Sequence, residues 1–507
     1  MPNRSDWKCA VEQGGLASGI PLGPTDHTKD DEFLSLNAID AVQHLVQGDL
    51  KAEDYCRALL RRCVAGAHLN AFINLCPDSA LAMAHDCDLK RRGGGKLGRL
   101  HGLPISIKDS VNTSNLPTTA GTRGLEHFRP REDAPLVRRL RDEGAIVLGK
   151  NNLHELSWGY SCNNAAFGPV RNPYDPTRIA GGSSGGTAAS IAYRMAPLGL
   201  AEDTEGSIRV PAALCGIAGF RPTTHRYDSS ATVPTTALFD QLGPHARSVA
   251  DLLLFDDAVT GAPRVSSPPA LERLRLGIVR PYFWTHLDPE VERVATEALD
   301  RLQRAGVILV EDDLPELPAL INRITRPVQF HDFQPTLSRY LARYDAGLTF
   351  EELIAQASPD IRSMTESMTA TNGANHVSDR QYEDILKSHL PALHAIYRSY
   401  FERTRVSAIV FPATLIPAPL LQRSASDSDL RIDVGGESMS FDAAISRNIG
   451  PGSTAALPGL VLPAGLTATG LPVALEFDGP SGADRTLLGL GLALEKTLGR
   501  LPAPGVA

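Results

Sequence analysis

The sequence predicts an α/β protein, and two helix-and-strand units carry that prediction. In the first unit, residues 134–143 have the apolar spacing of a helix and are followed by a short apolar strand at 145–149. In the second, a strand at 275–279 precedes a helix at 289–305 and a further strand at 307–310. The alternation continues with short strands and a closing helix at 408–411, 460–462, 473–477 and 486–498. Such alternation is typical of a sheet covered by helices.

The composition is that of an ordinary soluble globular protein. The chain has 507 residues, of which 42% are hydrophobic and 21% charged, and its formal net charge is −8. We therefore expect no basic face for nucleic acid or for an anionic membrane surface. The sequence contains neither an apolar run long enough to span a membrane nor an apolar segment near its start, so we expect a cytoplasmic protein. The seven cysteines have no CxxC spacing, which predicts free thiols without a zinc site.

Two regions differ from the α/β pattern in their composition and in the spacing of their apolar residues. Residues 1–35 are polar, carry no motif and are predicted to be an N-terminal extension, so that a single domain occupies residues 36–507. Residues 314–405 are helical and more polar, which predicts an inserted helical cap of the kind that selects substrates. Five aromatic or imidazole side chains gather near its start and favour an aryl substrate, namely Phe330, His331, Phe333, Tyr340 and Tyr344.

Further helices are predicted in the N-terminal third. Apolar residues at helical spacing predict two helices within residues 37–63, separated at Gly48 and Asp49. A third helix is predicted at 79–92 and ends at three consecutive glycines.

The stretch from Ala180 to Pro211 is the candidate site. Four glycines surround Ser183 and Ser184, and glycine this dense allows positive φ and close approach to a ligand. An Ala-rich helix is predicted from residue 187 and a short buried strand at 195–200, followed by a loop that ends at Ser207. Upstream, Lys108 directly follows an apolar run that predicts another buried strand.

These groups supply what amide hydrolysis requires. Serine needs a neighbour to take its proton, and a lysine acts as that base only when it is neutral. We expect burial to lower the pKa of Lys108 from about 10.4 towards roughly 7 to 8. Ser183 would relay the proton and Ser207 would attack, while N–H groups of the loop at Thr204, Glu205 and Gly206 would bind the oxyanion.

Three segments resemble the amidase signature family in order and spacing: GLPISIKD (102–109), AGGSSGG (180–186) and DTEGSIRVPAALCG (203–216). The similarity extends over residues 37–259 and 412–498. It implies a large mixed β-sheet sandwiched between helices, and a triad of the nucleophile Ser207, the bridging Ser183 after a cis peptide at Gly182, and the base Lys108. The acyl-enzyme would form at Ser207, without a metal or organic cofactor. A homodimer is common in such proteins.

Within this family the chain looks most like the arylacetamide branch, which contains mandelamide and indoleacetamide hydrolases. The segments that carry this resemblance are AALCGIAGFRPTTHRY (212–227) and FHDFQPTLSRYL (330–341). The expected substrate is a small aryl-containing primary amide. Anilides, phenylureas and carbamates are alternative substrates within the same family.

One position departs from the family pattern. Glu205 stands where the family usually has the first glycine of DTGGSIR. If that position required positive φ, a glutamate there would cost on the order of 1 kcal/mol. Its carboxylate would disfavour anionic substrates and contact an amine on the leaving side; the alternative is that it points to solvent. Asp203 and Arg209 are predicted to be a structural ion pair that shapes the loop.

Several other interpretations compete with this one. Residues 181–185 match GxSxG, the nucleophile elbow of α/β-hydrolases, but turn sequence replaces the strand that the motif needs before its serine. A non-catalytic, partner-binding subunit is a second alternative. His154 and Glu155 lack the second histidine of a zinc protease. Structural roles are predicted for the side chains His101, His225, His245 and Cys215.

Overall fold

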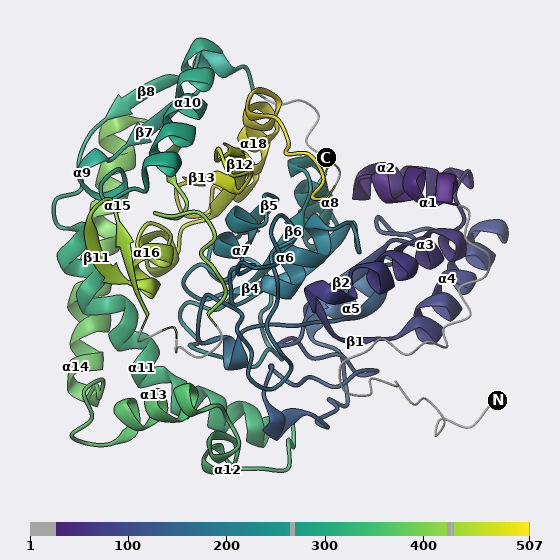
Figure 1. Cartoon of the computed structure of the whole chain (residues 1–507), viewed down its shortest axis with the longest axis horizontal. Helices are drawn as coiled ribbons and strands as arrows, with labels where there is room; N and C mark the ends of the chain where they lie inside the picture. The colour runs from purple at the N-terminus through teal and green to yellow at the C-terminus, as the bar shows by residue number, and fades with distance from the viewer. Residues whose placement is uncertain (1–26, 264–268, 423–426, 428–429, 506–507) are drawn as a thin grey trace.

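An eleven-stranded mixed sheet forms the centre of the computed structural model, which describes residues 27–263, 269–422, 427 and 430–505 (Figure 1). In spatial order the strands are β1 (Phe72–Leu75), β3 (Ile146–Asn151), β2 (Pro104–Lys108), β4 (Leu198–Asp203), β6 (Gln241–Ala246), β5 (Ala218–Arg221), β12 (Gly459–Leu466), β13 (Pro472–Asp478), β9 (Ala408–Pro412), β7 (Arg275–Ile278) and β8 (Ile308–Glu311). The predicted α/β class and mixed sheet are confirmed.

The two predicted helix-and-strand units lie in the two parallel parts of this sheet. Strand β2 pairs in parallel with β3 and β4, and β7 pairs in parallel with β8 and β9. Between these parts, β6, β5, β12 and β13 are antiparallel to their neighbours. Strands β1, β5 and β6 were not predicted from the sequence. All six residues of β6 are buried although they include Pro244, a residue that a central strand rarely contains.

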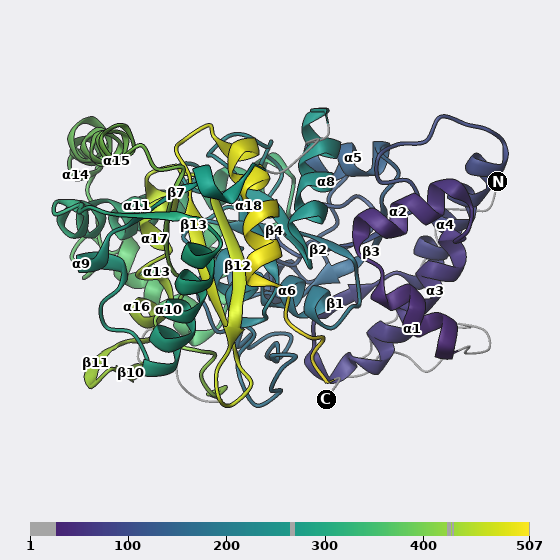
Figure 2. The ribbon, with the colours of Figure 1, turned by 90° about the horizontal axis from the view of Figure 1, so that it is seen from above.

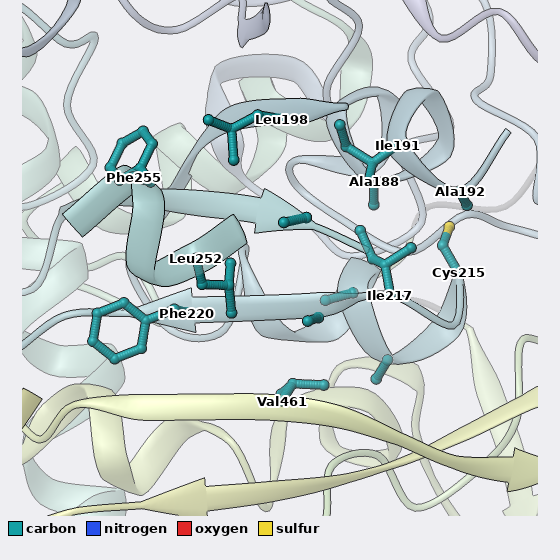
Figure 3. Close-up of a cluster of buried hydrophobic side chains, with 14 of the residues drawn as sticks. Ala188, Ile191, Ala192, Leu198, Cys215, Ile217, Phe220, Leu252, Phe255 and Val461 are labelled. Carbon is teal, nitrogen blue, oxygen red and sulfur yellow. The ribbon is translucent and has the colours of Figure 1, made fainter. Parts of the chain in front are cut away.

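Helices cover both faces of the sheet, as the view in Figure 2 shows. One face carries α5 (Pro135–Asp142), α8 (Val249–Thr260), α18 (Asp484–Leu498) and α10 (Pro289–Arg304). Along the sheet, α5 contacts α8, α8 contacts α18, and α18 contacts α10. On the opposite face, α6 (Gly185–Ala192) and α7 (Arg209–Leu214) contact each other. Figure 3 shows Ala188 and Ile191 of α6 in the same buried cluster as Phe220, Leu252 and Phe255. The site segments at the ends of α6 are therefore fixed by the core.

Four N-terminal helices pack on one another and on the neighbouring part of the sheet, through contacts of α4 with β3 and of α2 with α8. They are α1 (His27–Ser35), α2 (Ala38–Gln47), α3 (Ala52–Ala65) and α4 (Pro77–Arg92). The break at Gly48 and the helix up to Arg92 follow the prediction. Residues 27–35, expected to belong to a motif-free extension, form a helix that an ion pair between Asp30 and Arg61 joins to α3. Residues 1–26 of the predicted extension lie outside the described residues.

Residues 317–404 form the helical segment that lies at one end of the molecule (Figure 1). It comprises α11 (Leu317–Arg343), α12 (Phe350–Ala355), α13 (Pro359–Thr369), α14 (Asp379–Asp384), a π-helical turn (Ile385–His389) and α15 (Leu390–Thr404). Phe333 lies 5.1 Å from Trp158, ring centre to ring centre, and Tyr340 is buried in the same cluster. Phe333 and Tyr340, two of the five side chains expected to favour an aryl substrate, thus attach this segment to the body of the protein.

The remaining elements are short. They are the helices α9 (Arg280–Phe283), α16 (Phe441–Ser446) and α17 (Gly450–Thr454), and a hairpin of β10 (Arg431–Val434) with β11 (Glu437–Ser440). Single 3-10 turns occur at Ala67–Leu69, Arg123–Leu125, Glu155–Ser157 and Leu271–Arg273. No helix among the described residues is long and apolar enough to cross a membrane.

Candidate active site

The glycine-rich segment is a tight turn that leads into α6. The peptide bond between Gly182 and Ser183 is cis, as the family resemblance implies, and α6 begins at Gly185. A Cβ atom on Gly182 would lie 2.8 Å from the carbonyl oxygen of Gly159. Glycine is therefore required here because this chain's own backbone passes close by.

Lys108 and Ser183 meet beneath this turn. Lys108 is the last residue of β2, and its side chain and that of Ser183 are fully buried. The Nζ atom of Lys108 lies 2.6 Å from the Oγ atom of Ser183, a hydrogen-bonding distance. The end of β2 therefore brings Lys108 into contact with the glycine-rich segment.

A carboxylate that sequence analysis did not single out is the second partner of Lys108. The Oε2 atom of Glu202 lies 2.6 Å from Lys108 Nζ and 3.1 Å from the hydroxyl of Ser157. Lys108 therefore has two polar side-chain partners, the hydroxyl of Ser183 and the carboxylate of Glu202. Glu202 could have been predicted as this partner from the sequence, because a buried lysine needs a charged partner and Glu202 directly precedes the loop that ends at Ser207.

The carboxylate of Glu202 is in turn linked to that of Asp240. The hydroxyl of Thr204 lies 2.9 Å from Glu202 Oε1 and 2.7 Å from Asp240 Oδ1. Burial, and then the charge of Glu202, raise the pKa of the Asp240 carboxyl well above its ordinary value. The hydroxyl of Thr204 is therefore part of a buried carboxyl network, while its N–H, the group expected to bind the oxyanion, takes no part in that network.

Asp203 fixes the loop that carries Ser207. Its two carboxylate oxygens accept the backbone N–H groups of Gly206 and Ile208 at 2.8 and 3.0 Å. Its Oδ2 lies 3.1 Å from Arg209 Nε, which confirms the predicted ion pair, and its Oδ1 lies 3.2 Å from Arg221 Nε. Burial raises the pKa of Asp203, but the two arginines outweigh it and hold that pKa below its ordinary value. The Gly206 N–H, expected to bind the oxyanion, is bonded to Asp203.

The backbone at residues 205 and 206 overturns the expected strain at Glu205. Gly206 has φ +123°, a conformation that favours glycine, and a Cβ there would also meet the side chain of Ile449. Glu205 is not among the described non-glycine residues with positive φ. The cost expected for a glutamate at this position therefore does not arise.

Ser207 lies on the wall of a pocket that also exposes Glu205. The lining residues are His154, Ser157, Trp158, Gly159, Tyr160, Thr204, Glu205, Ser207, Thr235, Arg326, Gln329, Asp360, Ile361, Met364, Asp427 and Asp442. The carboxylate of Glu205 accepts a hydrogen bond from Gln329 at 2.7 Å and lies 3.4 Å from Arg326 Nε. Its side chain is only 12% exposed, so the alternative in which Glu205 points to solvent is wrong.

The two serine segments contact each other through their backbones. The N–H of Ser184 donates to the carbonyl of Ser207 at 3.3 Å, while no side-chain hydrogen bond joins Ser183 to Ser207 in the described part of the chain. Turn and loop residues precede Ser183, which is fully buried. The nucleophile-elbow alternative, which requires an exposed serine directly after a strand, does not fit this geometry.

The remaining candidates have structural environments. His245 lies 2.7 Å from the carbonyl of Ile208, and burial lowers its pKa to about 4. The buried Cys215 thiol donates to the carbonyl of Ala180, and burial raises its pKa. Burial also lowers the pKa of His101. Among the described residues, no group of three His, Cys, Asp or Glu side chains is arranged to hold a metal ion.

Comparison with known proteins shows similarity over most of the chain. A family model described as Amidase matches residues 54–488. The chain is 36% identical to the indoleacetamide hydrolase of Agrobacterium vitis over 92% of this chain and 97% of that protein. It is 35% identical to the mandelamide hydrolase of Pseudomonas putida, over 88% of each chain. A solved structure described as an amidase superposes with a TM-score of 0.81 at 28% identity, covering 92% of this chain and 100% of the other.

Together, the fold and these similarities define a hydrolase that acts on amides. The chain belongs to the amidase family. The family resemblance drawn from its three sequence segments is confirmed.

Proposed function

We propose that this chain hydrolyses a small, aryl-containing primary amide through an acyl-enzyme formed at Ser207. The observation that carries the proposal is the 2.6 Å contact between Lys108 and Ser183, buried behind the turn whose backbone contacts Ser207. Only Ser207 of these three residues lines the pocket, so it is the group that meets a substrate.

In the proposed reaction, Ser207 Oγ attacks the amide carbon while its proton passes to Ser183, whose own proton passes to a neutral Lys108. When the tetrahedral intermediate collapses, the C–N bond breaks and the proton returns through Ser183 to the leaving amine. Water then attacks the acyl-enzyme by the same relay and releases the acid. The hydrogen bond from the Ser184 N–H to the Ser207 carbonyl, which joins the two serine segments, supports this relay.

The oxyanion is assigned to backbone groups of the Ser207 loop. Because the Gly206 N–H is bonded to Asp203, the donors that remain in the loop are the N–H groups of Thr204, Glu205 and Ser207. None of these three has a hydrogen-bond acceptor within the described part of the chain. Donors preorganised in this way stabilise a developing oxyanion strongly.

The pocket lining favours an aryl group that carries no negative charge. Trp158, Tyr160, Ile361 and Met364 supply apolar surface. Four carboxylates also line the pocket, at Glu205, Asp360, Asp427 and Asp442, against the single guanidinium of Arg326. A carboxylate on the substrate would meet this excess of negative charge, so we expect uncharged or amine-bearing amides to be preferred.

The helical segment contributes to this selectivity. Arg326 and Gln329 of α11 hold Glu205, and Ile361 and Met364 of α13 line the pocket. We infer that residues 314–405 act as a substrate-selecting cap on a single domain of residues 36–507. The proposal also includes a small-molecule substrate as partner, a possible homodimer and a cytoplasmic location. It includes no cofactor and no nucleic-acid partner.

Release of amine from a small substrate panel tests the proposal. The panel contains 2-phenylacetamide, its 4-carboxy analogue, an acetanilide, a phenylurea and an aryl carbamate, with Ser207→Ala as the control. Ammonia from 2-phenylacetamide that disappears in the variant is the expected result, with the carboxy analogue at least about tenfold slower. Aniline from the substituted substrates would instead assign an anilide or urea hydrolase. No turnover of any substrate would favour the non-catalytic alternative.

A further inference from the structure

The hydrogen bonds around Thr204 determine how many protons its two carboxyl neighbours carry. Its hydroxyl has one proton and contacts both Glu202 Oε1, at 2.9 Å, and Asp240 Oδ1, at 2.7 Å. The hydroxyl can donate to only one of these oxygens. The other contact is a hydrogen bond only if that carboxyl group carries a proton and donates it to Thr204.

The surroundings of the two carboxyl groups place this proton on Asp240. Glu202 Oε2 accepts from both Lys108, at 2.6 Å, and Ser157, at 3.1 Å, so it has two donors, one of them an amine that can take up a proton. Asp240 Oδ2 accepts only the backbone N–H groups of Thr235 and Thr236, at 2.8 and 3.1 Å. Within the described residues, Asp240 has no ion-pair partner, and the pKa of its carboxyl is raised as noted above.

The other charged and titratable groups nearby favour the same assignment. The N–H of Thr236 donates to Asp240 and its hydroxyl donates to Asp332 of α11 at 2.6 Å, so this neighbour of Asp240 leads to a second carboxyl group and not to a basic side chain. Tyr382 and His331 adjoin Asp332, and His245 stands near Lys108 with a pKa that burial lowers to about 4. Within the described residues, none of these side chains forms an ion pair or a hydrogen bond with Asp240.

We propose that Glu202, Thr204 and a protonated Asp240 form a proton-sharing chain that positions Lys108 for its role as base. Glu202 is ionised, Thr204 donates to it, and Asp240 donates to Thr204. The inference rests on the proposed function, in which Lys108 gains a proton when Ser207 attacks. Glu202 then has the role toward Lys108 that the aspartate of a serine-protease triad has toward its histidine. It orients the base and stabilises the protonated form of the base.

Two isosteric substitutions locate the proton and test the chain. In Asp240→Asn, the amide NH₂ replaces the carboxyl O–H as the donor to Thr204, so kcat/KM should fall only about threefold and the acid limb of its pH profile should stay in place. In Glu202→Gln, the negative charge beside Lys108 is removed, so kcat/KM at its optimum should fall about 100-fold. The neutral lysine then forms more readily, which moves the acid limb to lower pH.

The opposite pattern overturns the proposal. If Asp240→Asn loses as much as Glu202→Gln, or if Glu202→Gln leaves the acid limb unchanged, the assigned protonation is wrong. Infrared difference spectra give a readout that does not depend on activity: the band of a neutral carboxylic acid should disappear in Asp240→Asn. If that band persists, the proton does not reside on Asp240.

A second matched pair covers the case in which Glu202→Gln does not fold. Thr204→Ser keeps the hydroxyl and should retain the wild-type acid limb, whereas Thr204→Val has the same shape without it and should lose about tenfold in kcat/KM. Equal behaviour of these two variants overturns the chain. Failure of the proposed function is recognised separately, because Lys108→Met and Ser207→Ala would then retain wild-type turnover.

Discussion

The carboxylate of Asp203 is expected to be the largest single contributor to the stability of the catalytic loop. Asp203→Asn keeps the shape of the side chain but removes a fully buried charge that faces Arg209 and Arg221. Removing one partner of a buried ion pair costs about 3–5 kcal/mol, because the other charge stays buried. With an unfolding entropy of about 2 cal/mol/K per residue, a 507-residue chain loses about 1 °C in Tm for each kcal/mol. We therefore expect Tm to fall by about 3–5 °C.

Thermal unfolding of the purified variants measures this change, with Asp88→Asn as the matched control. Asp88 of α4 is also a buried carboxylate, and it accepts the N–H groups of Ala52 and Glu53 at the N-terminus of α3, away from the site. Its substitution should cost about 1–2 kcal/mol and leave kcat unchanged. A Tm for Asp203→Asn within 1 °C of that for Asp88→Asn would refute the reasoning.

Three further predictions concern pH and catalysis. Because the pKa of Asp203 is lowered on folding, its contribution to stability is complete above its unfolded pKa of about 4 and is lost as pH falls below that value; Asp203→Asn should flatten the acid limb of a Tm-against-pH plot. Lys108→Met should lower kcat about 10²–10⁴-fold. The control Lys150→Met, which removes a buried lysine paired with Asp109, should lower Tm but not kcat. Equal losses of kcat in the two variants would contradict the assignment of Lys108 as the base. In the wild type, kcat/KM should rise with pH and stay high to about pH 9, and a maximum near pH 5 would argue against a lysine base.

The sequence pointed to Lys108, Ser183 and Ser207, but not to the buried carboxyl groups that surround them. Lys108, Ser183 and the Ser207 loop were predicted to converge because serine needs a base and the strand pattern delivers one. Lys108 contacts Ser183, and the Ser207 loop meets the same segment through the Ser184 N–H, while the catalytic roles of these residues stay a prediction. Glu202 and Asp240 were missed, since their importance comes from β4 and β6 lying side by side. Strand β6 itself has no alternating pattern from which it could be predicted.

The helical segment shows a second limit of sequence patterns. Its helical spacing was visible, but the spacing does not say which of its aromatic side chains face the pocket. The structure buries Phe333 and Tyr340 against the body of the protein and turns Arg326 and Gln329 towards Glu205. Pro327 and Pro335 lie inside α11, so even residues that usually end helices do not mark its boundaries.

The loop from residue 203 to 207 divides its two tasks between different side chains. Asp203 faces the buried arginines and fixes the backbone, whereas Glu205 faces the pocket and is held by Gln329 and Arg326. Stability and substrate choice should therefore separate by mutation. Glu205→Gly should leave Tm within about 1–2 °C of the wild type, because a partly exposed ion pair contributes little, yet raise kcat/KM for the 4-carboxy substrate relative to 2-phenylacetamide. An unchanged ratio of these two substrates would show that Glu205 does not select against negative charge, and Glu205→Gln, which keeps the shape, distinguishes charge from bulk.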